Sequence, residues 1–430
     1  MKTDQIQKVH KDWYKLDLSA IVYPTLQRRD FSSVYRLSVL LKEDIDPEIL
    51  QRAVNLTMPR FPTYKAAIRK GVFWRYLEPN DRPGPFVQED VKNPCQPMHF
   101  KGNNRYLVRI YYYRNRIALE AHHSLGDGTG GMCVLQTLTA TYLRLKGHSE
   151  IENGGFVLDI LGIPDPGELE DAYMKYANAK VCPPRPGEKT YRVRGTKEPF
   201  YTLNIIDGIM SVSEVMQVAK SYNATITEYL NSVLLYALMQ KQESEWHLKL
   251  RPVKIAMPVN LRRFFPSRTL RNFITMIYPG IDPRLGEYTF EEIVIQVHNY
   301  MRYYLNEKLL RGDITTNAET QRNPFIRILP LFIKDLVVRQ FYTKIQDKNS
   351  SAGLTNMGAL KVPETMKPYI ERFDIYMGQP FSTRTNCAIA SFEDILTINF
   401  ASSIAETDVE RLFFRKLVQD GIHVKIESNR

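Results

Sequence analysis

Alternation of apolar and polar side chains is the clearest pattern in the first half of the chain. In the run 116–121, the side chains of Ile117, Leu119 and Ala121 share one face, as in a strand with one buried side. The preceding run, residues 106–113, has a similar character, and a short polar turn separates the two. These positions predict a β-hairpin that ends at residue 122.

Helical spacing follows this hairpin. Apolar residues recur three to four positions apart between residues 135 and 145, and Gly147 is a typical helix end. An earlier helix is predicted over residues 44–59, and two strands joined near Gly71 are predicted over residues 61–77. The first half therefore reads as mixed α/β structure.

The second half repeats this mixture with longer helices. Strands are predicted near residues 200–206 and 253–259, and long helices over residues 290–310 and 326–345. The helix 326–345 is apolar with basic interruptions, so it could line an acceptor pocket or touch a membrane surface. Because apolar helical segments pack more often into the interior, we expect it to be a core helix.

Three spacings of a hydroxyl residue and a glutamate are typical of capping boxes at helix starts: Ser211 to Glu214, Thr225 to Glu228 and Thr407 to Glu410. The last of these follows a predicted hairpin over residues 387–401, and Gly421 should end its helix. This order of hairpin and helix repeats that of residues 106–147. Two similar halves are therefore expected, and because only the first contains a pair of adjacent histidines, we expect one active site where the halves meet.

A proline- and glycine-bearing stretch between residues 162 and 199 has little apolar periodicity and is read as a linker. The predicted organisation is an N-terminal lobe over residues 1–165, a crossover linker over 166–198 and a C-terminal lobe over 199–430. The fold class is α/β.

Composition places the chain among soluble globular proteins. It has 430 residues, of which 43% are hydrophobic and 24% charged. The formal net charge is +11, from 58 basic and 47 acidic residues, but no run of five or six basic residues occurs. This argues against nucleic-acid binding. A dispersed positive field suits an anionic small molecule, although it is equally an ordinary property of a basic protein.

The four cysteines, Cys95, Cys133, Cys182 and Cys387, lie far apart and form no C-x-x-C pair. They suggest a reducing compartment, with neither a zinc site nor a disulfide framework. The N-terminal residues have no apolar signal core, and nowhere do eighteen apolar residues run together. No transmembrane segment is expected, and a cytoplasmic location is the default.

Candidate chemistry is concentrated in A-H-H-S-L-G-D-G-T-G-G, residues 121–131. Strand alternation places His123 on the apolar face and His122 on the opposite one, which argues against a metal site made by both. The glycines permit a sharp turn before the following helix. Such a junction can hold an exposed base, although adjacent histidines at a strand end are more often ordinary.

The pattern H-H-x-x-x-D-G resembles the active-site motif of the CoA-dependent acyltransferase superfamily, which includes chloramphenicol-acetyltransferase-like enzymes and condensation domains of peptide synthetases. The resemblance implies two α/β sandwich lobes with the active-site channel between them. It also implies that the second histidine of the motif, His123, is catalytic. Residues 259–273 resemble the second-half loop that faces the site, and residues 354–358 resemble a segment of the channel floor.

Among subgroups, the chain looks most like stand-alone alcohol acetyltransferase-type proteins. It has no D-F-G-W-G string and no adenylation or carrier segment. The resemblance implies transfer of an acyl group, with acetyl as the expected one, from acetyl-CoA or another acyl-CoA to an alcohol, with His123 as general base. No acyl-enzyme, covalently bound cofactor or metal is implied, and no G-x-S-x-G elbow occurs. Two alternatives remain: an amide-forming condensation catalyst that takes thioesters from a carrier protein and acylates an amine, and a non-catalytic binding or scaffold protein.

Several further residues are singled out by the same resemblance. His122, Asp127 and Gly128 belong to the motif in structural roles, since a sharp turn would direct Asp127 away from the His123 ring. The resemblance implies an arginine partner for Asp127, either Arg262 or Arg263, and the alternative is a plain helix cap.

Asn272 and Asn356 carry amides and are candidates for the second-half wall of the channel. For both, simple turn stabilisation is the alternative explanation.

Overall fold

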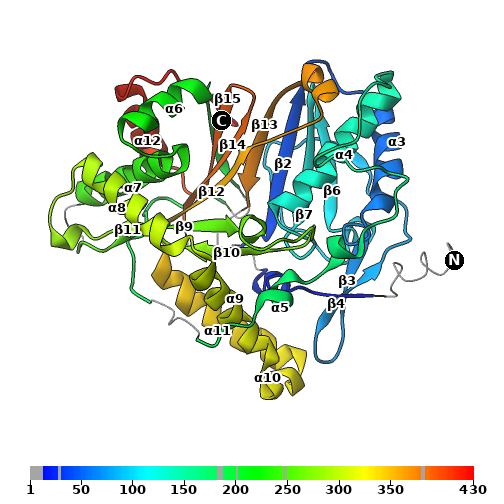
Figure 1. The fold of residues 1–430 in the computed structure, drawn as a ribbon, viewed down its shortest axis with the longest axis horizontal. Coiled ribbons are helices and arrows are strands. Elements are labelled where there is room, and N and C mark those ends of the chain that lie inside the picture. Colours follow the sequence, from blue (N-terminus) through cyan, green and yellow to red (C-terminus); the bar gives the residue numbers. More distant parts are fainter. Residues whose placement is uncertain are drawn as a thin grey trace.

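The computed structural model describes residues 13–27, 31–181, 187–199, 202–245, 247, 249–378 and 383–430. Two α/β lobes lie side by side in Figure 1, each with a sheet and covering helices, and a group of helices lies below them in that view. This arrangement confirms the predicted fold class.

The predicted hairpin 106–122 is confirmed and forms the middle of the first lobe's five-stranded sheet. The strand order is β13-β2-β7-β6-β5. The bounds are β2 Val34–Leu41, β5 Val87–Glu89, β6 Val108–Tyr113, β7 Arg116–His122 and β13 Ile370–Met377. All of these pairings are antiparallel except that of β5 with β6.

Two helices pack on this sheet. Helix α3 (Pro47–Thr57) begins at Asp46, whose carboxylate accepts hydrogen bonds from two backbone N–H groups. Helix α4 (Gly128–Lys146) is buried from Gly130 to Leu143, including its polar side chains in that range. It ends at Gly147, whose φ of +121° favours glycine. A small sheet beside them contains β1 (Tyr14–Lys15), β3 (Ala66–Lys70) and β4 (Arg75–Pro79).

The second lobe contains an eight-stranded sheet, ordered β10-β9-β12-β14-β15-β8-β16 with β11 beside β9. Its strands are β8 Asn204–Ser211, β9 Val253–Asn260, β10 Ile274–Ile277, β11 Gly280–Ile281, β12 Ala352–Ala359, β14 Thr385–Phe392, β15 Ile395–Ser402 and β16 Lys425–Ser428. Its covering helices are α6 Val212–Ser221, α7 Ile226–Ser244, α8 Phe290–Tyr304 and α12 Asp408–Gln419. The hairpin β14–β15 followed by α12 matches the predicted echo of the first lobe.

Strand β13 crosses the boundary that the sequence suggests. It comes from the second half of the chain but pairs with β2, with Phe373 opposite Val39. The boundary near residue 198 therefore does not separate the two sheets. The described part of the stretch 166–198 is largely irregular, with a 3₁₀ turn (Pro166–Leu169) and one short α-helix, α5 (Ala172–Tyr176); residues 182–186, which include Cys182, lie outside the described part.

Three predicted elements differ from the structure. The predicted strand 200–206 is β8, which begins at Asn204 and continues to Ser211; residues 200 and 201 are not described. The predicted helix 290–310 is two helices, α8 and α9 (Glu307–Arg322), because the Asn306 side chain caps a new helix start. The predicted helix 326–345 is also two, α10 (Pro324–Ile328) and α11 (Leu331–Asn349), which Pro330 separates.

The expectation that this last segment packs into the core is wrong. Phe325, Ile328 and Phe332 are each more than two thirds exposed. Helices α10 and α11 extend from the body of the molecule with α9, as Figure 1 shows. The short helix α2 (Tyr23–Leu26) packs against α11.

The three predicted capping boxes have different outcomes. At Thr225 both halves of the box are present, and Ser211 accepts a hydrogen bond from the Glu214 N–H. Thr407 makes no side-chain cap, so the third box is wrong. Its glutamate, Glu410, is instead buried and accepts a hydrogen bond from Thr385, a distant contact that local spacing does not reveal.

Among the described residues, no helix has the length and apolarity to cross a bilayer, and no three His, Cys, Asp or Glu side chains are grouped as metal ligands. Cys95, Cys133 and Cys387 are buried free thiols.

Candidate active site

Strand β7 ends at the histidine pair, and the chain then turns into α4. The His123 N–H donates to the carbonyl of Ser33 at 2.8 Å, and the Leu125 N–H donates to the carbonyl of His122 at 3.0 Å. Residues 123–127 form this turn before α4 begins at Gly128. The motif is therefore held by main-chain hydrogen bonds at the junction of a strand and a helix.

His122 is a fully buried, neutral side chain. Its Nδ1 accepts a hydrogen bond from the Ser124 N–H at 3.2 Å, and its ring lies edge-on to Phe100 at 5.4 Å. Burial lowers the pKa of His122 to about 3, and the neighbouring His123 adds to the effect. This environment suits a packing role.

His123 is partly exposed, in contrast to His122. Its ring stacks on Tyr23 with centroids 4.8 Å apart and tilts against Tyr35 at 4.6 Å. Tyr35 is paired directly with Ala121 across β2 and β7, so the two side chains share a face of the sheet. His123 therefore lies on the apolar face, in agreement with the alternation of the sequence.

The electrostatic setting keeps the His123 ring neutral. Burial lowers the pKa of His123 to about 4, and the negative charge of Asp127 and hydrogen bonds to Asn272 and the Gly126 backbone oppose this only in part. At neutral pH the imidazole is unprotonated and can accept a proton, which a general base requires.

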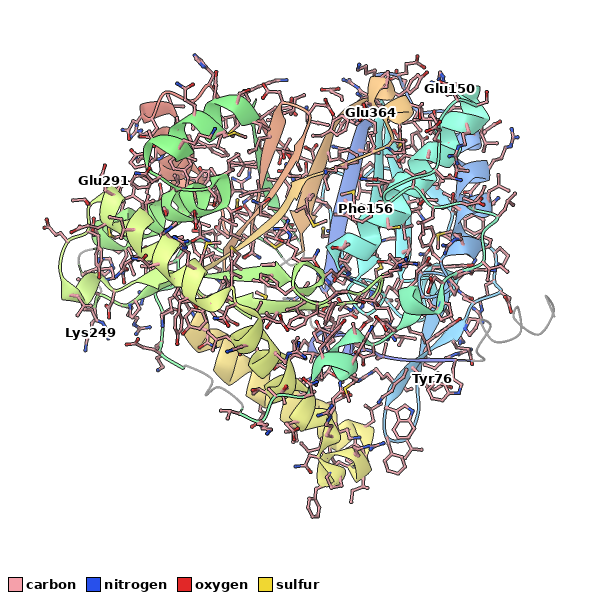
Figure 2. All side chains as sticks on the ribbon, in the orientation of Figure 1. Tyr76, Glu150, Phe156, Lys249, Glu291 and Glu364 are labelled. Atoms are coloured by element: carbon pink, nitrogen blue, oxygen red, sulfur yellow. The ribbon has the colours of Figure 1, made fainter. Side chains whose placement is uncertain are left out.

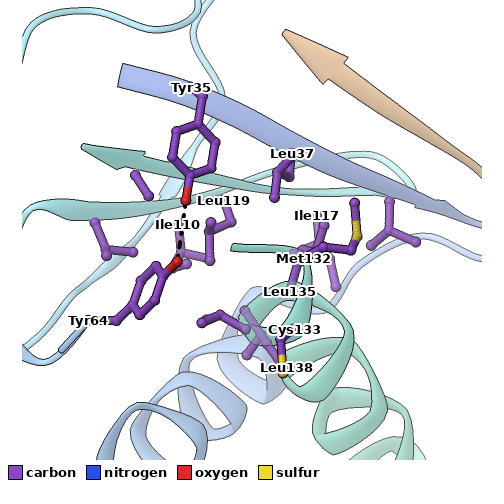
Figure 3. Packing of buried hydrophobic residues seen from close by; sticks show 14 of the residues in the cluster. Tyr35, Leu37, Tyr64, Ile110, Ile117, Leu119, Met132, Cys133, Leu135 and Leu138 are labelled. Carbon is purple, nitrogen blue, oxygen red and sulfur yellow. Dashed lines mark hydrogen bonds between the residues drawn. The ribbon is translucent and has the colours of Figure 1, made fainter. Parts of the chain in front are cut away.

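A tyrosine pair fixes the floor of the turn. The Tyr35 hydroxyl donates to the carbonyl of Asp127 at 3.2 Å and lies 3.4 Å from the Tyr64 hydroxyl, as the dashed line in Figure 3 shows. Burial raises the pKa of both phenols, so they stay protonated as hydrogen-bond donors. Beneath them, the apolar residues Leu37, Met132 and Leu135 pack between the sheet and α4.

The Asp127 carboxylate makes both of the interactions that the sequence left open. Its Oδ1 accepts from the N–H groups of Thr129 and Gly130 and so caps α4. Its Oδ2 accepts from Arg262 Nη1 at 2.8 Å and from the Phe273 N–H at 2.9 Å. One carboxylate thus joins the first turn of α4 to the loop of the second lobe.

Of the two arginines proposed for this pairing, Arg262 is the partner. Its guanidinium is mostly buried and also donates from Nε to the carbonyl of Thr269 at 2.9 Å. Arg263 is exposed and lies beside Gly358.

The two asparagines occupy different places. Asn272 is fully buried, so its side chain offers no surface to a channel; its Nδ2 donates to the His123 carbonyl at 2.9 Å and to the Asp17 carboxylate at 3.1 Å. Asn356 donates to Thr227 Oγ1 at 2.8 Å and accepts from the Gly358 N–H at 2.7 Å. Asn272 therefore holds the His123 turn, whereas Asn356 stabilises the end of β12.

The glycines of the motif permit close approach of the second lobe. A Cβ atom added at Gly130 would lie 1.9 Å from the carbonyl oxygen of Leu270, and one at Gly126 would lie 2.4 Å from it. A Cβ at Gly128 would meet the sulfur of Met357, from β12, at 3.0 Å. The lobes meet directly at the motif, and this is a second reason for its glycines beyond the turn.

Sequence reasoning missed two aromatic neighbours of His123 and the acidic partner of Asn272. Tyr23 and Tyr35 precede His123 by about a hundred positions, and Asp17 lies on the N-terminal segment, where it is buried beside Arg271 at 3.6 Å. None of the three belongs to a motif or a periodic run, so no local signal marks them.

A cavity of about 460 Å³ lies elsewhere, at the start of β9. Five cationic residues line it: Arg192, Arg194, Lys249, Arg251 and Arg384. Asn260, at the far end of β9, donates to Thr129 of the motif. The eight-residue strand is roughly 23 Å long at the usual rise, so this cavity is separate from the His123 site.

No protein-family model and no curated protein sequence matches the chain. Solved structures do match over nearly the whole length. The starter condensation domain of rhizomide synthetase, in complex with C8-CoA, is 13% identical with a TM-score of 0.60, and the match covers 98% of this chain and 100% of that one.

A trichothecene 15-O-acetyltransferase from Fusarium sporotrichioides is 14% identical with a TM-score of 0.57, and the match covers 95% of this chain and 94% of that one. A wax ester synthase/diacylglycerol acyltransferase from Marinobacter aquaeolei is 13% identical with a TM-score of 0.52, and the match covers 95% and 100%. These likenesses confirm the fold that the histidine motif predicts.

Proposed function

Because the chain has the fold of the CoA-dependent acyltransferase superfamily, we propose that it transfers an acyl group from acyl-CoA to the hydroxyl of an alcohol, with His123 as the general base. One observation carries the proposal: His123 is a neutral, partly exposed imidazole at the junction of the two lobes. His122 is closed off from any substrate by complete burial.

The chemistry requires only one proton carrier. An alcohol is a poor nucleophile, so His123 removes its proton as the oxygen attacks the thioester carbon. The new C–O bond forms a tetrahedral oxyanion, and the C–S bond then breaks. The imidazolium returns the proton to the departing thiolate, which leaves an ester and free CoA. Neither a serine nor a cysteine nucleophile takes part.

The surrounding residues hold this base in position. Asn272 fixes the His123 carbonyl, and the Asp127–Arg262 pair fixes the turn and the start of α4. Tyr23 and Tyr35 hold the ring between them. In this proposal Asp127 acts on structure and does not contact the reacting atoms.

The donor is proposed to be acetyl-CoA or a related acyl-CoA, used in the cytoplasm. The net charge of +11 favours an anionic donor. The alternative donor is a thioester on a carrier protein, with an amine as acceptor; condensation domains among the similar structures favour testing it. A non-catalytic binding role is the remaining alternative.

The test is transfer of a radiolabelled acetyl group to a panel of alcohols and amines, from acetyl-CoA and, separately, from a phosphopantetheine carrier protein. We expect ester formation from acetyl-CoA and alcohols, and its loss in the His123→Ala variant. Transfer only from the carrier protein and only to amines would favour the condensation reaction. Absence of transfer from both donors would contradict both enzymatic functions.

A further inference from the structure

An apolar surface at one end of the molecule is not explained by acyl transfer. Six side chains make up this apex patch: Val72, Phe73, Trp74, Phe325, Ile328 and Phe332. Each is exposed over 40 to 77% of its surface. They come from the hairpin β3–β4 and from helices α10 and α11; α10 lies at the lower end of Figure 2, below the labelled Tyr76 of β4.

The two parts of the apex patch are fixed to each other. The Leu331 N–H donates to the carbonyl of Val72 at 2.9 Å, and Lys334 Nζ donates to the carbonyl of Phe73 at 2.8 Å. Arg75 and Asp335 form an ion pair at 2.6 Å, in which the arginine is almost completely buried. The apolar side chains therefore stand on a preorganised support.

The charges around the apex patch are predominantly positive. Residues 66–79 and 324–339 contain six basic residues and two carboxylates. Both carboxylates are neutralised within the structure, Asp335 by Arg75 and Glu78 by Arg69 at 2.6 Å. Lys70 and Arg327 are exposed. The surface thus combines exposed aromatic rings with an excess of cations.

We propose that the apex patch is a docking surface for an anionic phospholipid bilayer. Phe and Trp side chains partition into the boundary between headgroups and acyl chains, and neighbouring Lys and Arg attract anionic headgroups. Exposed apolar clusters of this kind mark interaction sites on soluble proteins. The protein would lie on the surface without spanning it.

Charge favours this partner over a second copy of the chain. A symmetric dimer through the apex patch would bring Lys70 and Arg327 of both copies into one interface, and such like charges oppose association. An anionic surface compensates these cations. The proposal stands independently of acyl transfer, because it rests only on the exposure and the charge of this surface.

The test is co-sedimentation of the full chain with sonicated vesicles, either of phosphatidylcholine alone or of an equal mixture with phosphatidylglycerol. The wild-type chain should bind the anionic vesicles more strongly than the neutral ones. Phe325→Ser combined with Phe332→Ser should lower the partition coefficient at least about tenfold, since two apolar side chains are lost. Leu161→Ser combined with Leu285→Ser is the matched control, because these leucines are 89% and 79% exposed elsewhere.

A second double variant tests how much the cations beside the apex patch contribute to vesicle binding. Lys70→Gln combined with Arg327→Gln should reduce binding to anionic vesicles roughly fivefold per charge, from about 1 kcal/mol per basic residue near such a surface. Binding to neutral vesicles should be unchanged. The proposal is overturned if the wild-type chain does not bind anionic vesicles, or if the leucine control loses as much binding as the phenylalanine pair. It is also overturned if sedimentation velocity shows a dimer that the phenylalanine variant dissociates.

Discussion

The Nη1 atom of Arg262 lies 2.8 Å from Oδ2 of Asp127, and this ion pair connects the second lobe to the turn that carries His123. The same carboxylate caps α4 through Thr129 and Gly130. Asp127 therefore contributes to stability through two sets of contacts at once.

Replacing Asp127 by alanine should lower both stability and activity. The change leaves the mostly buried Arg262 without its partner and uncaps α4, at a cost on the order of 3–5 kcal/mol. Urea denaturation followed by circular dichroism measures it. Asp127→Ala combined with Arg262→Met should recover part of the loss, because no unpaired charge remains. An Asp127→Ala chain with wild-type stability and no turnover would favour a direct catalytic role instead.

The two histidines should respond differently to substitution. His123→Ala removes the general base, so single-turnover transfer should fall roughly 10²–10⁴-fold while affinity for the acyl-CoA changes little. His122→Ala should mainly lower stability, by about 1 kcal/mol for the lost Ser124 hydrogen bond and more for the cavity. Equal rate losses in the two variants would contradict the assignment of one histidine to each face of the sheet.

The pH dependence of kcat/KM should report the His123 environment. Its pKa is lowered to about 4 by burial, so the base is unprotonated well below neutrality. The acid limb of kcat/KM should therefore lie near pH 4, and the profile should be flat from pH 6 to 7.5. Measurements in overlapping buffers at constant ionic strength test this. An acid limb near 6.5, the ordinary histidine value, would show that the ring is solvated in the free protein.

Stability should also depend on pH through His122. The folded-state pKa is about 3 and the ordinary value is 6.5, so only the unfolded chain gains a proton between these limits. The contribution of His122 to the pH dependence of the free energy of unfolding is absent above pH 6.5. Below pH 6.5 it destabilises the folded chain by about 1.4 kcal/mol for each pH unit. Between pH 7 and pH 5, the free energy of unfolding of the His122→Leu chain should therefore fall by about 2 kcal/mol less than that of the wild type.

This comparison isolates His122 from opposing groups. Burial raises the pKa of Asp207, and it raises the pKa of Glu410 to about 7, so both carboxyls stabilise the fold as the pH falls. They are present in the wild type and in the variant and cancel in the difference. Parallel stability curves for the two chains would contradict the buried, neutral state of His122.

Gly130→Ala tests the close approach of the lobes. In an isolated helix this change stabilises by about 1 kcal/mol. Here the added Cβ lies 1.9 Å from the backbone of Leu270, so the second-lobe loop must move and the net effect should be a loss of about 1–3 kcal/mol. Gly187→Ala, with no atom within 4 Å of its added Cβ, is the control and should be neutral. Differential scanning calorimetry compares them; a more stable Gly130→Ala chain would contradict the predicted clash.

Local patterns predicted the elements that local interactions determine. The hairpin β6–β7 follows from alternation, and Gly147 ends α4 because its φ favours glycine. Where distant contacts decide, the patterns failed. Glu410 does not cap its helix and instead accepts a hydrogen bond from Thr385, and Phe325, Ile328 and Phe332 of α10–α11 are exposed although the composition of this segment is that of a core helix.

The candidate site shows the same division. His123 and Asp127 lie in one short motif, whereas Tyr23, Tyr35 and Asp17 reach the site only through the tertiary fold. The resemblance narrowed the partner of Asp127 to two adjacent arginines. In the short 3₁₀ turn after β9, which Asn260 caps, Arg262 reaches Asp127 and the next residue, Arg263, is exposed.

The pairing of β13 with β2 also constrains how the protein is made. Because Phe373 lies opposite Val39, the first sheet stays incomplete until nearly the whole chain has left the ribosome. Until then β2 presents an unpaired edge, to which another nascent chain could add a strand. Such long-range pairing also slows folding. A fragment that ends at residue 198 should therefore aggregate when expressed alone, and a supplied peptide covering residues 370–377 should keep it in solution.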